Sequence, residues 1–217
     1  MEEIIIEESF INQDFIQNPI ELGEYDSCKF IGCNFQNSNL SGFKFIDCEF
    51  EECNLSSVKM NNTSLQTIEF KGCKILGVHF DECNSFGLSL SFENCQLNHS
   101  IFFQLQLPKT KFINSKLIDV DFGECDLRDS QFQQSDLSGA IFENCDLQKA
   151  DFRNANNYNL DPEKNKLKNA KFSVDGLAGL LGKYQIKEAV QKGQLFLCRY
   201  FQISTSSFTY FFLIMNF

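Results

Sequence analysis

Large apolar residues recur at every fifth position over most of the chain. Between residues 92 and 152 this position alternates between Phe and Leu without exception: Phe92, Leu97, Phe102, Leu107, Phe112, Leu117, Phe122, Leu127, Phe132, Leu137, Phe142, Leu147 and Phe152. A period of five matches neither the α-helix, with 3.6 residues per turn, nor a simple strand, with two. An unbroken short repeat instead predicts a solenoid, in which each unit is stable only when stacked on its neighbours.

The same spacing continues towards the N-terminus in a second frame. Its central residues are again large and apolar: Phe30, Phe35, Leu40, Phe45, Phe50, Leu55, Met60, Leu65, Phe70, Ile75 and Phe80. Because Phe92 follows Phe80 by twelve residues rather than ten, we expect a register slip that bulges out within residues 83–90. The pattern is interrupted again by an excursion at residues 156–166 and returns as Leu167 and Phe172. We therefore assign residues 1–172 to one repeat domain.

A second position of each unit is also restricted. Two residues before the central residue the side chain is usually small or β-branched, as at Cys48, Val58 and Ser135. Residues two apart on an extended segment face the same way, so both positions should point inwards while the other three face water. Nine of the ten cysteines fall at this small position. We interpret them as compact fillers. A metal site or stacked disulfides are the alternatives, although parallel side chains do not converge tetrahedrally on an ion.

The repeating unit, a small residue followed by Asn or Asp, Leu or Phe and two variable residues, resembles the pentapeptide repeat family. Its clearest examples are Ser135–Gly139 (SDLSG), Ala140–Asn144 (AIFEN), Cys145–Lys149 (CDLQK) and Ala150–Asn154 (ADFRN). The resemblance implies an all-β solenoid, namely a right-handed quadrilateral β-helix with one pentapeptide per side and four sides per coil.

In a four-sided coil of pentapeptides, residues twenty apart stack on one another. Phe92, Phe112, Phe132 and Phe152 would then form one ladder, and Phe102, Phe122 and Phe142 would form the opposite one. Leucine ladders would fill the two sides between them. Phe30, Phe50 and Phe70 form the clearest ladder of the first half. Rings about 4.8 Å apart, the spacing of neighbouring strands, suit offset aromatic pairs.

The region after the repeats is expected to cover the open end of the solenoid. Residues 173–190 predict a short C-terminal capping helix with Ser173 as its N-cap, and a solenoid needs such a cover. Apolar residues lie on one face at helical spacing, and the candidate cap or homodimer face comprises Leu177, Leu180, Leu181 and Tyr184. The dimer alternative comes from the resemblance, because this region mediates dimerisation in some family members.

The last segment, residues 191–217, is an atypical hydrophobic tail. Only residues 208–215 are densely apolar, which is short of the roughly 20 residues that span a bilayer. We expect a poorly ordered tail and no membrane association, with a tail anchor as the alternative. The acidic N-terminus lacks the basic start and long apolar core of a secretory signal, so we expect a cytoplasmic protein.

The charge of the chain is negative and unevenly distributed. Residues 1–158 carry 25 Asp and Glu against 11 Lys and Arg, whereas residues 159–217 carry 4 against 8. An acidic body argues against direct nucleic-acid binding, because phosphates require Lys and Arg. It fits a basic protein partner, and the alternative is simply a solvated surface.

Acidic residues are densest towards the end of the repeats, opposed there by Arg128 and Lys149. They are Asp119, Asp121, Glu124, Asp126, Asp129, Asp136, Glu143, Asp146 and Asp151. Asp126 and Asp146 should lie one coil apart on one face. A narrow rod with acidic stripes would imitate the shape and charge of a DNA duplex; the alternative is that any acidic solenoid carries such stripes. These nine residues are our candidate partner-facing surface.

The sequence contains no recognisable catalytic or cofactor motif. His79 and His99 fall at outward positions without a Ser-His-Asp or Cys-His grouping around them. A Gly-rich phosphate loop and a Cys-x-x-Cys pair are both lacking, and paired acids such as Glu51 and Glu52 are surface charges by default. We therefore predict a protein that is not an enzyme and needs neither metal nor cofactor.

The resemblance also suggests a partner. Some bacterial pentapeptide repeat proteins are DNA mimics that bind type II topoisomerases and protect against quinolones, which makes DNA gyrase or topoisomerase IV the expected partner. Those proteins often carry longer projecting loops, whereas this chain has only the slip at 83–90 and the excursion at 156–166. The alternative function is a generic protein-interaction scaffold with no topoisomerase role.

Overall fold

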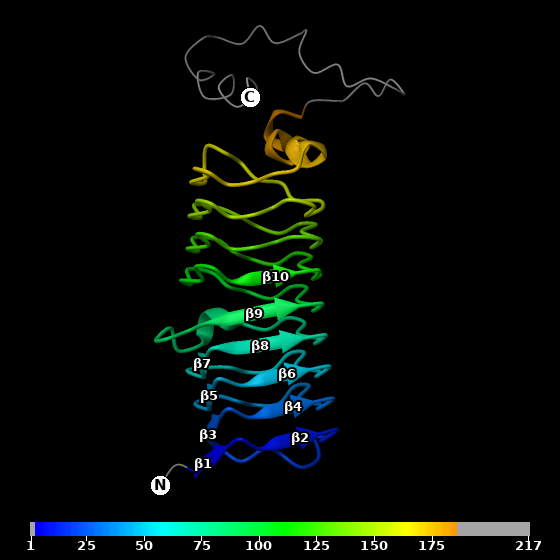
Figure 1. The fold of residues 1–217 in the computed structure, drawn as a ribbon, viewed down its shortest axis with the longest axis vertical. Helices are drawn as coiled ribbons and strands as arrows, with labels where there is room; N and C mark the ends of the chain where they lie inside the picture. Colours follow the sequence, from blue (N-terminus) through cyan, green and yellow to red (C-terminus); the bar gives the residue numbers. More distant parts are fainter. Residues whose placement is uncertain (1–2, 186–217) are drawn as a thin grey trace, which may run out of the picture. The chain divides into compact units, whose positions relative to one another are not determined.

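Residues 3–185, which are those that the computed structural model describes, wind into a right-handed, four-sided β-helix ending in a short helical cap (Figure 1). The strands are short and parallel: β1 (Glu3–Ile6), β2 (Ser9–Ile11), β3 (Gly23–Asp26), β4 (Lys29–Ile31), β5 (Lys44–Ile46), β6 (Glu49–Glu51), β7 (Ser64–Gln66), β8 (Ile68–Lys71), β9 (Leu90–Glu93) and β10 (Lys111–Ile113). One sheet has the order β1-β3-β5-β7 and the other β2-β4-β6-β8-β9-β10. After β10, single parallel bridges continue the register. The predicted tail, residues 191–217, lies outside the described residues.

The four sides of the coil are named here by one central residue each. The Phe92 wall has Phe10, Phe30, Phe50, Phe70, Phe92, Phe112, Phe132, Phe152 and Phe172 as its central residues. The Leu97 wall has Phe15, Phe35, Leu55, Ile75, Leu97, Leu117 and Leu137; the Phe102 wall has Ile20, Leu40, Met60, Phe80, Phe102, Phe122 and Phe142; and the Leu107 wall has Tyr25, Phe45, Leu65, Leu107, Leu127, Leu147 and Leu167. Along each wall, bridged or paired residues in adjacent coils are twenty apart, or slightly more across the slip.

The Phe92 wall contains one unbroken ladder of nine stacked rings. Neighbouring ring centroids lie 4.7–5.3 Å apart from Phe10 to Phe172. The predicted ladders are therefore confirmed, and the two halves are continuous, since Phe70 stacks on Phe92 at 5.1 Å. On the Phe102 wall, Phe80 begins a second ladder, with spacings of 4.6–5.2 Å. Rings of the two ladders meet edge to face, as in Phe102 with Phe112, so they form a herringbone core between the leucine columns.

The register slip is absorbed on the Leu107 wall alone. Asn84 still bridges Ser64 one coil earlier, and Leu90 already pairs with Ile68 at the start of β9. The extra residues between them project as a bulge just before β9 (Figure 1), with Phe86 79% exposed. The other walls keep their register because the insertion is completed before the next corner.

The small inward position carries hydrogen bonds as well as volume. Ser135 Oγ donates to the carbonyl of Phe112, at 2.7 Å, and accepts the backbone N–H of Ser115, at 3.0 Å. Cys125 Sγ donates in the same way to the carbonyl of Phe102, at 2.8 Å. Where Ser, Thr or Cys occupies the position, its polar hydrogen thus binds a carbonyl of the adjacent coil, a contact that Val or Ala at the same position lacks. Within residues 3–185 the nine cysteines are buried, unpaired thiols.

The cap rests on the excursion of residues 156–166 and differs from the predicted helix. It consists of two 3-10 helices, η2 (Val174–Leu180) and η3 (Gly182–Tyr184), so a single regular helix over 173–190 is wrong for its described part. Glycines three apart, at 176, 179 and 182, share one side of a helix with three residues per turn. A Cβ on Gly179 would lie 2.3 Å from the carbonyl oxygen of Tyr158, so close approach requires glycine. Ser173 occupies the N-cap position without a side-chain hydrogen bond.

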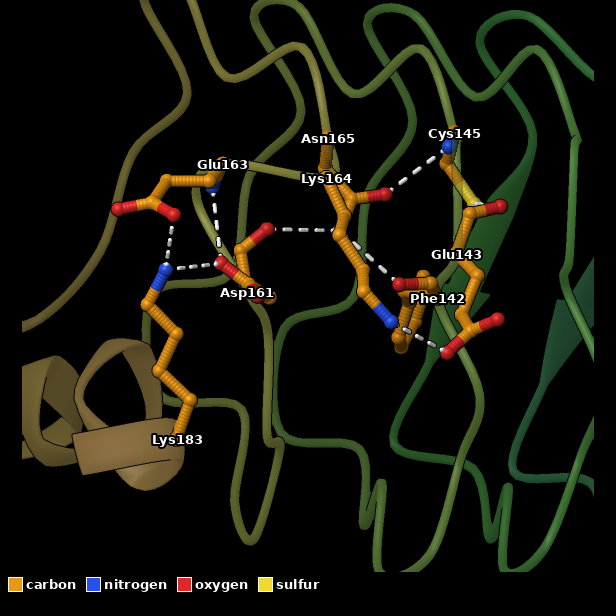
Figure 2. A network of polar contacts seen from close by, with 8 residues as sticks. All are labelled: Phe142, Glu143, Cys145, Asp161, Glu163, Lys164, Asn165 and Lys183. Carbon is orange, nitrogen blue, oxygen red and sulfur yellow. Dashed lines mark hydrogen bonds and ion pairs between the residues drawn. The ribbon is translucent and has the colours of Figure 1, made fainter. Parts of the chain in front are cut away.

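Polar contacts fasten the cap and the excursion to the coils below (Figure 2). Lys183 Nζ lies 2.9 Å from Asp161 Oδ1 and 2.6 Å from Glu163 Oε2. Asn165 fills the small inward position of the last coil: its Nδ2 donates to the carbonyl of Phe142 and its Oδ1 accepts the N–H of Cys145, both at 2.9 Å. The excursion thus continues the hydrogen-bond pattern of the repeats with a longer side chain.

Replacing a central ring of the Phe92 ladder should destabilise the coil strongly. For Phe112→Ala we expect a loss of about 3–5 kcal/mol in the free energy of unfolding, the usual cost of removing a buried Phe. Lys111→Ala, at the neighbouring outward position, should stay within about 0.5 kcal/mol of the parent. Urea unfolding followed by circular dichroism measures both, and equal midpoints for the two variants would contradict the ladder's role.

Candidate partner-binding surface

The nine predicted acidic residues occupy two kinds of position. Asp121, Asp126, Asp136, Asp146 and Asp151 directly precede a central residue, whereas Asp119, Glu124, Asp129 and Glu143 lie on the corners. Each of the first kind accepts the backbone N–H two residues further on, at 2.8–3.3 Å. Asn residues at the same position of earlier coils do the same. These aspartates therefore first of all hold the corner, as Asx turns do.

Asp126 and Asp151 are buried and paired with arginines of their own turns. Asp126 is 8% exposed and Asp151 is 6% exposed. Arg128 Nε lies 2.8 Å from Asp126 Oδ1, and Arg153 Nη2 lies 2.7 Å from Asp151 Oδ2. In each case the arginine's side-chain hydrogen bond holds the pKa of the carboxyl below its usual range. Neither carboxylate has its charge free for a partner.

The Leu107 wall is not the acidic face that the pair Asp126 and Asp146 suggested. The two residues are indeed bridged one coil apart, as predicted. However, the pentapeptides of this wall from residue 105 to residue 169 balance Asp126, Asp129 and Asp146 with Lys109, Arg128, Lys149, Lys166 and Lys168. Lys166 Nζ lies 3.7 Å from Asp146 Oδ2. Basic side chains therefore outnumber acidic ones here.

The Leu97 wall holds two further members of the predicted set, and both have local partners. Asp136 accepts hydrogen bonds from Ser138 Oγ, at 2.6 Å, and from Asn157 Nδ2, at 2.9 Å. The bond from Ser138 is the main cause that lowers the pKa of the Asp136 carboxyl. Asp119 Oδ2 lies 3.7 Å from His99 Nδ1.

The Phe102 wall carries the uncompensated negative charge. Its pentapeptides 78–82, 100–104, 120–124 and 140–144 contain Asp81, Glu82, Asp121, Glu124 and Glu143 but no Lys or Arg. From elsewhere, Lys164 Nζ lies 3.0 Å from Glu143. Burial raises the pKa of the Asp81 carboxyl. The negative charges of Glu82 and Asp121 raise it further, whereas the nearby His79 lowers it. The structure thus brings Asp121, Glu124 and Glu143 of the predicted set onto one face and distributes the others.

The same wall exposes apolar side chains that the sequence reasoning missed. Ile101 and Ile141 occupy the outward position that usually holds a polar residue, and Phe103 lies on a corner. Ile141 is 46% exposed and Phe103 is 38% exposed. The signal was available in the sequence, because an apolar residue directly before a central residue breaks the rule of the repeat.

The candidate cap or dimer residues are divided between the core and the surface. Leu180 packs against the core cluster, Leu177 and Leu181 are half-buried, and Tyr184 is 51% exposed. Tyr184 Oη donates to Glu163 Oε1, at 3.3 Å. Of the four residues, Tyr184 is therefore the most exposed and the one with a polar partner.

The described part of the chain holds neither a candidate metal site nor a helix that could span a membrane. No group of three or more His, Cys, Asp or Glu in residues 3–185 is arranged to hold a metal ion. None of the helices in the same range is long and apolar enough to cross a membrane.

Comparison with known proteins places the repeats in a family. A family model described as "pentapeptide repeat region" matches residues 24–102, 85–152 and 105–180. Two trypsin-treated variants of QnrB1, a plasmid-mediated fluoroquinolone resistance protein, have similar structures: one is 19% identical with a TM-score of 0.56, covering 87% of this chain and 99% of that one. The other is 24% identical with a TM-score of 0.55, covering 87% and 92%. No curated protein sequence matches significantly.

The paired aspartates should make the stability of the fold depend on pH. Because the folded-state pKa values of Asp126 and Asp151 are lowered, their stabilisation is present above the unfolded value of about 3.9 and is lost as pH falls through the folded value. The double variant Asp126→Asn, Asp151→Asn keeps the turn acceptor but removes the charge.

We expect the urea midpoint of the parent to fall between about pH 5 and pH 2. The double variant should be less stable at pH 7 and show a shallower decline. Asp129→Asn, an exposed acid of the same turn as Asp126, is the control and should retain the parent's slope. A double variant whose midpoint falls as steeply as the parent's would rule out this origin of the acid sensitivity.

Proposed function

The chain belongs to the pentapeptide repeat family, and from this we propose that it acts as a non-catalytic, acidic rod that binds a protein partner. The observation that carries the proposal is the uneven distribution of charge around the coil. Asp126 and Asp151 are paired with arginines of their own turns, whereas the acids of the Phe102 wall between residues 78 and 144 accumulate without Lys or Arg in the same pentapeptides. Charge left uncompensated on a rigid scaffold favours a basic partner.

The partner we propose is a type II topoisomerase, either DNA gyrase or topoisomerase IV, in the cytoplasm of a bacterium. The acidic wall of a rod would occupy the enzyme's basic DNA-binding surface as a duplex does. Direct nucleic-acid binding by this protein is disfavoured, because the Phe102 wall would repel phosphates. The similar fold of QnrB1, a fluoroquinolone resistance protein, is compatible with this role, although at 19–24% identity it speaks for the fold alone.

The alternative function is a protein-interaction scaffold without a topoisomerase role. The observation that favours it is the small amount of structure outside the coils. The bulge within residues 83–90 and the excursion at 156–166 are short, and the excursion is used for capping by Tyr158 and Leu160, both buried. A topoisomerase assay separates the two functions.

Purified protein should bind DNA gyrase and alter its activity if the topoisomerase proposal is right. We expect pull-down at low salt, inhibition of supercoiling at micromolar protein and partial relief of quinolone-stabilised cleavage. Raising the ionic strength should weaken the interaction, since exposed charges are screened beyond about 10 Å at 0.1 M salt. The charge-reversal pair Asp121→Lys, Glu124→Lys should weaken it further. Absence of both binding and any change in supercoiling would falsify the topoisomerase proposal and leave the scaffold.

We also propose that the C-terminal cap can join two copies of the chain. All four residues of the predicted face, Leu177, Leu180, Leu181 and Tyr184, retain exposed surface, and a second copy would cover it. Sedimentation velocity should then show a dimer for the full chain at tens of micromolar, and Leu177→Glu should convert it to a monomer. Lys168→Glu, on the Leu107 wall, is the control. A monomeric parent at this concentration excludes a dimer of useful affinity.

A further inference from the structure

The ring of Phe103 lies close to the next coil at Gly123. A Cβ on Gly123 would lie 3.0 Å from Phe103 Cδ2 and 3.2 Å from Phe103 Cε2. Gly123 does not have a left-handed backbone, so it is not needed for the corner. Its role is to leave room for the ring above it. The ring therefore lies against the next coil while 38% of the residue remains exposed to solvent.

A carboxylate lies beside this ring. The same Cβ position on Gly123 is 3.1 Å from Asp121 Oδ1, so the edge of the ring and the carboxylate converge on one point of the surface. Asp121 accepts only the N–H of Gly123 among the described hydrogen bonds, and no described cation pairs with it. At the corner that follows Asp121, Glu124 Oε2 accepts a hydrogen bond from Gln104 Nε2 of the adjacent coil, at 2.8 Å.

Apolar side chains frame the carboxylate along the axis of the coil. Ile101 and Ile141 are the bridged neighbours of Asp121 in the coils on either side. Parallel bridges align these three side chains in one outward column. The column therefore consists of an acidic side chain between two apolar ones, with the ring of Phe103 beside it. A rod that only had to remain soluble would place polar residues at all three positions, as the Leu97 wall does at Asn34, Asn54 and Lys74.

We propose that Ile101, Phe103, Asp121, Glu124 and Ile141 form a docking surface for a basic, partly apolar segment of a protein partner. An Arg or Lys of the partner would stack on the ring of Phe103 with its charge facing Asp121, because an aromatic face and a carboxylate both attract a cation. An apolar side chain next to that cation would cover Ile101 or Ile141. This inference rests on the proposed function and names the contact surface of the same rod.

The other exposed Phe of the coils lacks this environment. Phe86 is more exposed than Phe103, but it lies on the bulge of the Leu107 wall between Ser85 and Gly87, away from the acidic column. Similarly, Asp129 is a corner acid like Glu124, on a wall where basic residues are in excess. Phe86 and Asp129 are therefore matched controls for the ring and for the charge.

The experiment uses a synthetic twelve-residue peptide of alternating Arg and Leu as the probe and the full chain as the receptor. Isothermal titration at low salt measures its Kd for the parent and for Phe103→Ala, Asp121→Asn, Phe86→Ala and Asp129→Asn. We expect the first two changes to weaken binding about fivefold to tenfold, as for loss of a partly desolvated cation contact. The two controls should change Kd less than about twofold.

A second variant separates the contribution of the aromatic ring from that of its apolar volume. Phe103→Leu keeps an apolar side chain at this corner, and a peptide with citrulline in place of Arg keeps the shape of the guanidinium without its charge. Phe103→Leu should weaken the Arg peptide and leave binding of the citrulline peptide unchanged. Urea midpoints of all variants show whether the fold is intact, and Phe103→Leu remains informative if Phe103→Ala is unstable.

The outcomes separate this surface from the topoisomerase proposal. Selective weakening by Phe103→Ala and Asp121→Asn supports the surface even when gyrase does not bind the parent. Equal weakening by Phe103→Ala and Phe86→Ala, or by Asp121→Asn and Asp129→Asn, overturns the surface even when gyrase binds. A parent that does not bind the Arg peptide at millimolar concentration overturns it as well.

Discussion

Stacking of the coils in a twenty-residue register is the constraint on which the other features of this molecule depend. Both the parallel backbone hydrogen bonds and the ring stacks require this register. A slip of one residue would turn inward side chains outwards. Across the insertion, Phe70 stacks on Phe92 at an interplanar angle of 7°, within the 6–23° of the other pairs of the ladder. The extra residues were therefore accommodated where they cost least, on a wall with no aromatic ladder above Leu65. Each stacked pair contributes roughly 0.5–1.5 kcal/mol beyond the burial of its area.

The register also arranges the outward side chains into columns, so that their interactions are set by neighbours in adjacent coils. On the Phe92 wall ion pairs join neighbouring coils: Lys29 Nζ lies 3.1 Å from Glu49 Oε1, and Lys71 Nζ lies 3.6 Å from Glu49 Oε2. Exposed pairs of this kind stabilise a fold only slightly. The composition of an outward column is therefore open to selection for binding, and the run of Ile101, Asp121 and Ile141 is one that stability does not require.

Much of the architecture was predictable because it follows from a period. The ladders of Phe92 and Phe102 and the inward cysteines need only the repeat and the number of sides. The 3-10 cap was not predictable in the same way, because its glycines fit against Tyr158, whose position depends on the excursion. The candidate surface was predicted only in part. A count of acidic residues along the chain mixes residues from all four walls. Assigning each acidic residue to its wall identifies Asp121 and Glu124 as the members of the candidate surface that lie on the Phe102 wall without a cation partner among the described residues.

Asp121 and Asp126 show why position in the repeat does not decide the role of a residue. Both directly precede a central Phe or Leu, and both accept the N–H two residues later. Arg128 follows Asp126 at that place and neutralises it, whereas Gly123 follows Asp121, leaving its charge uncompensated and admitting the ring of Phe103. The exchange of one residue two positions downstream thus converts a structural carboxylate into an accessible one. Net charge alone, which counts both equally, cannot distinguish them.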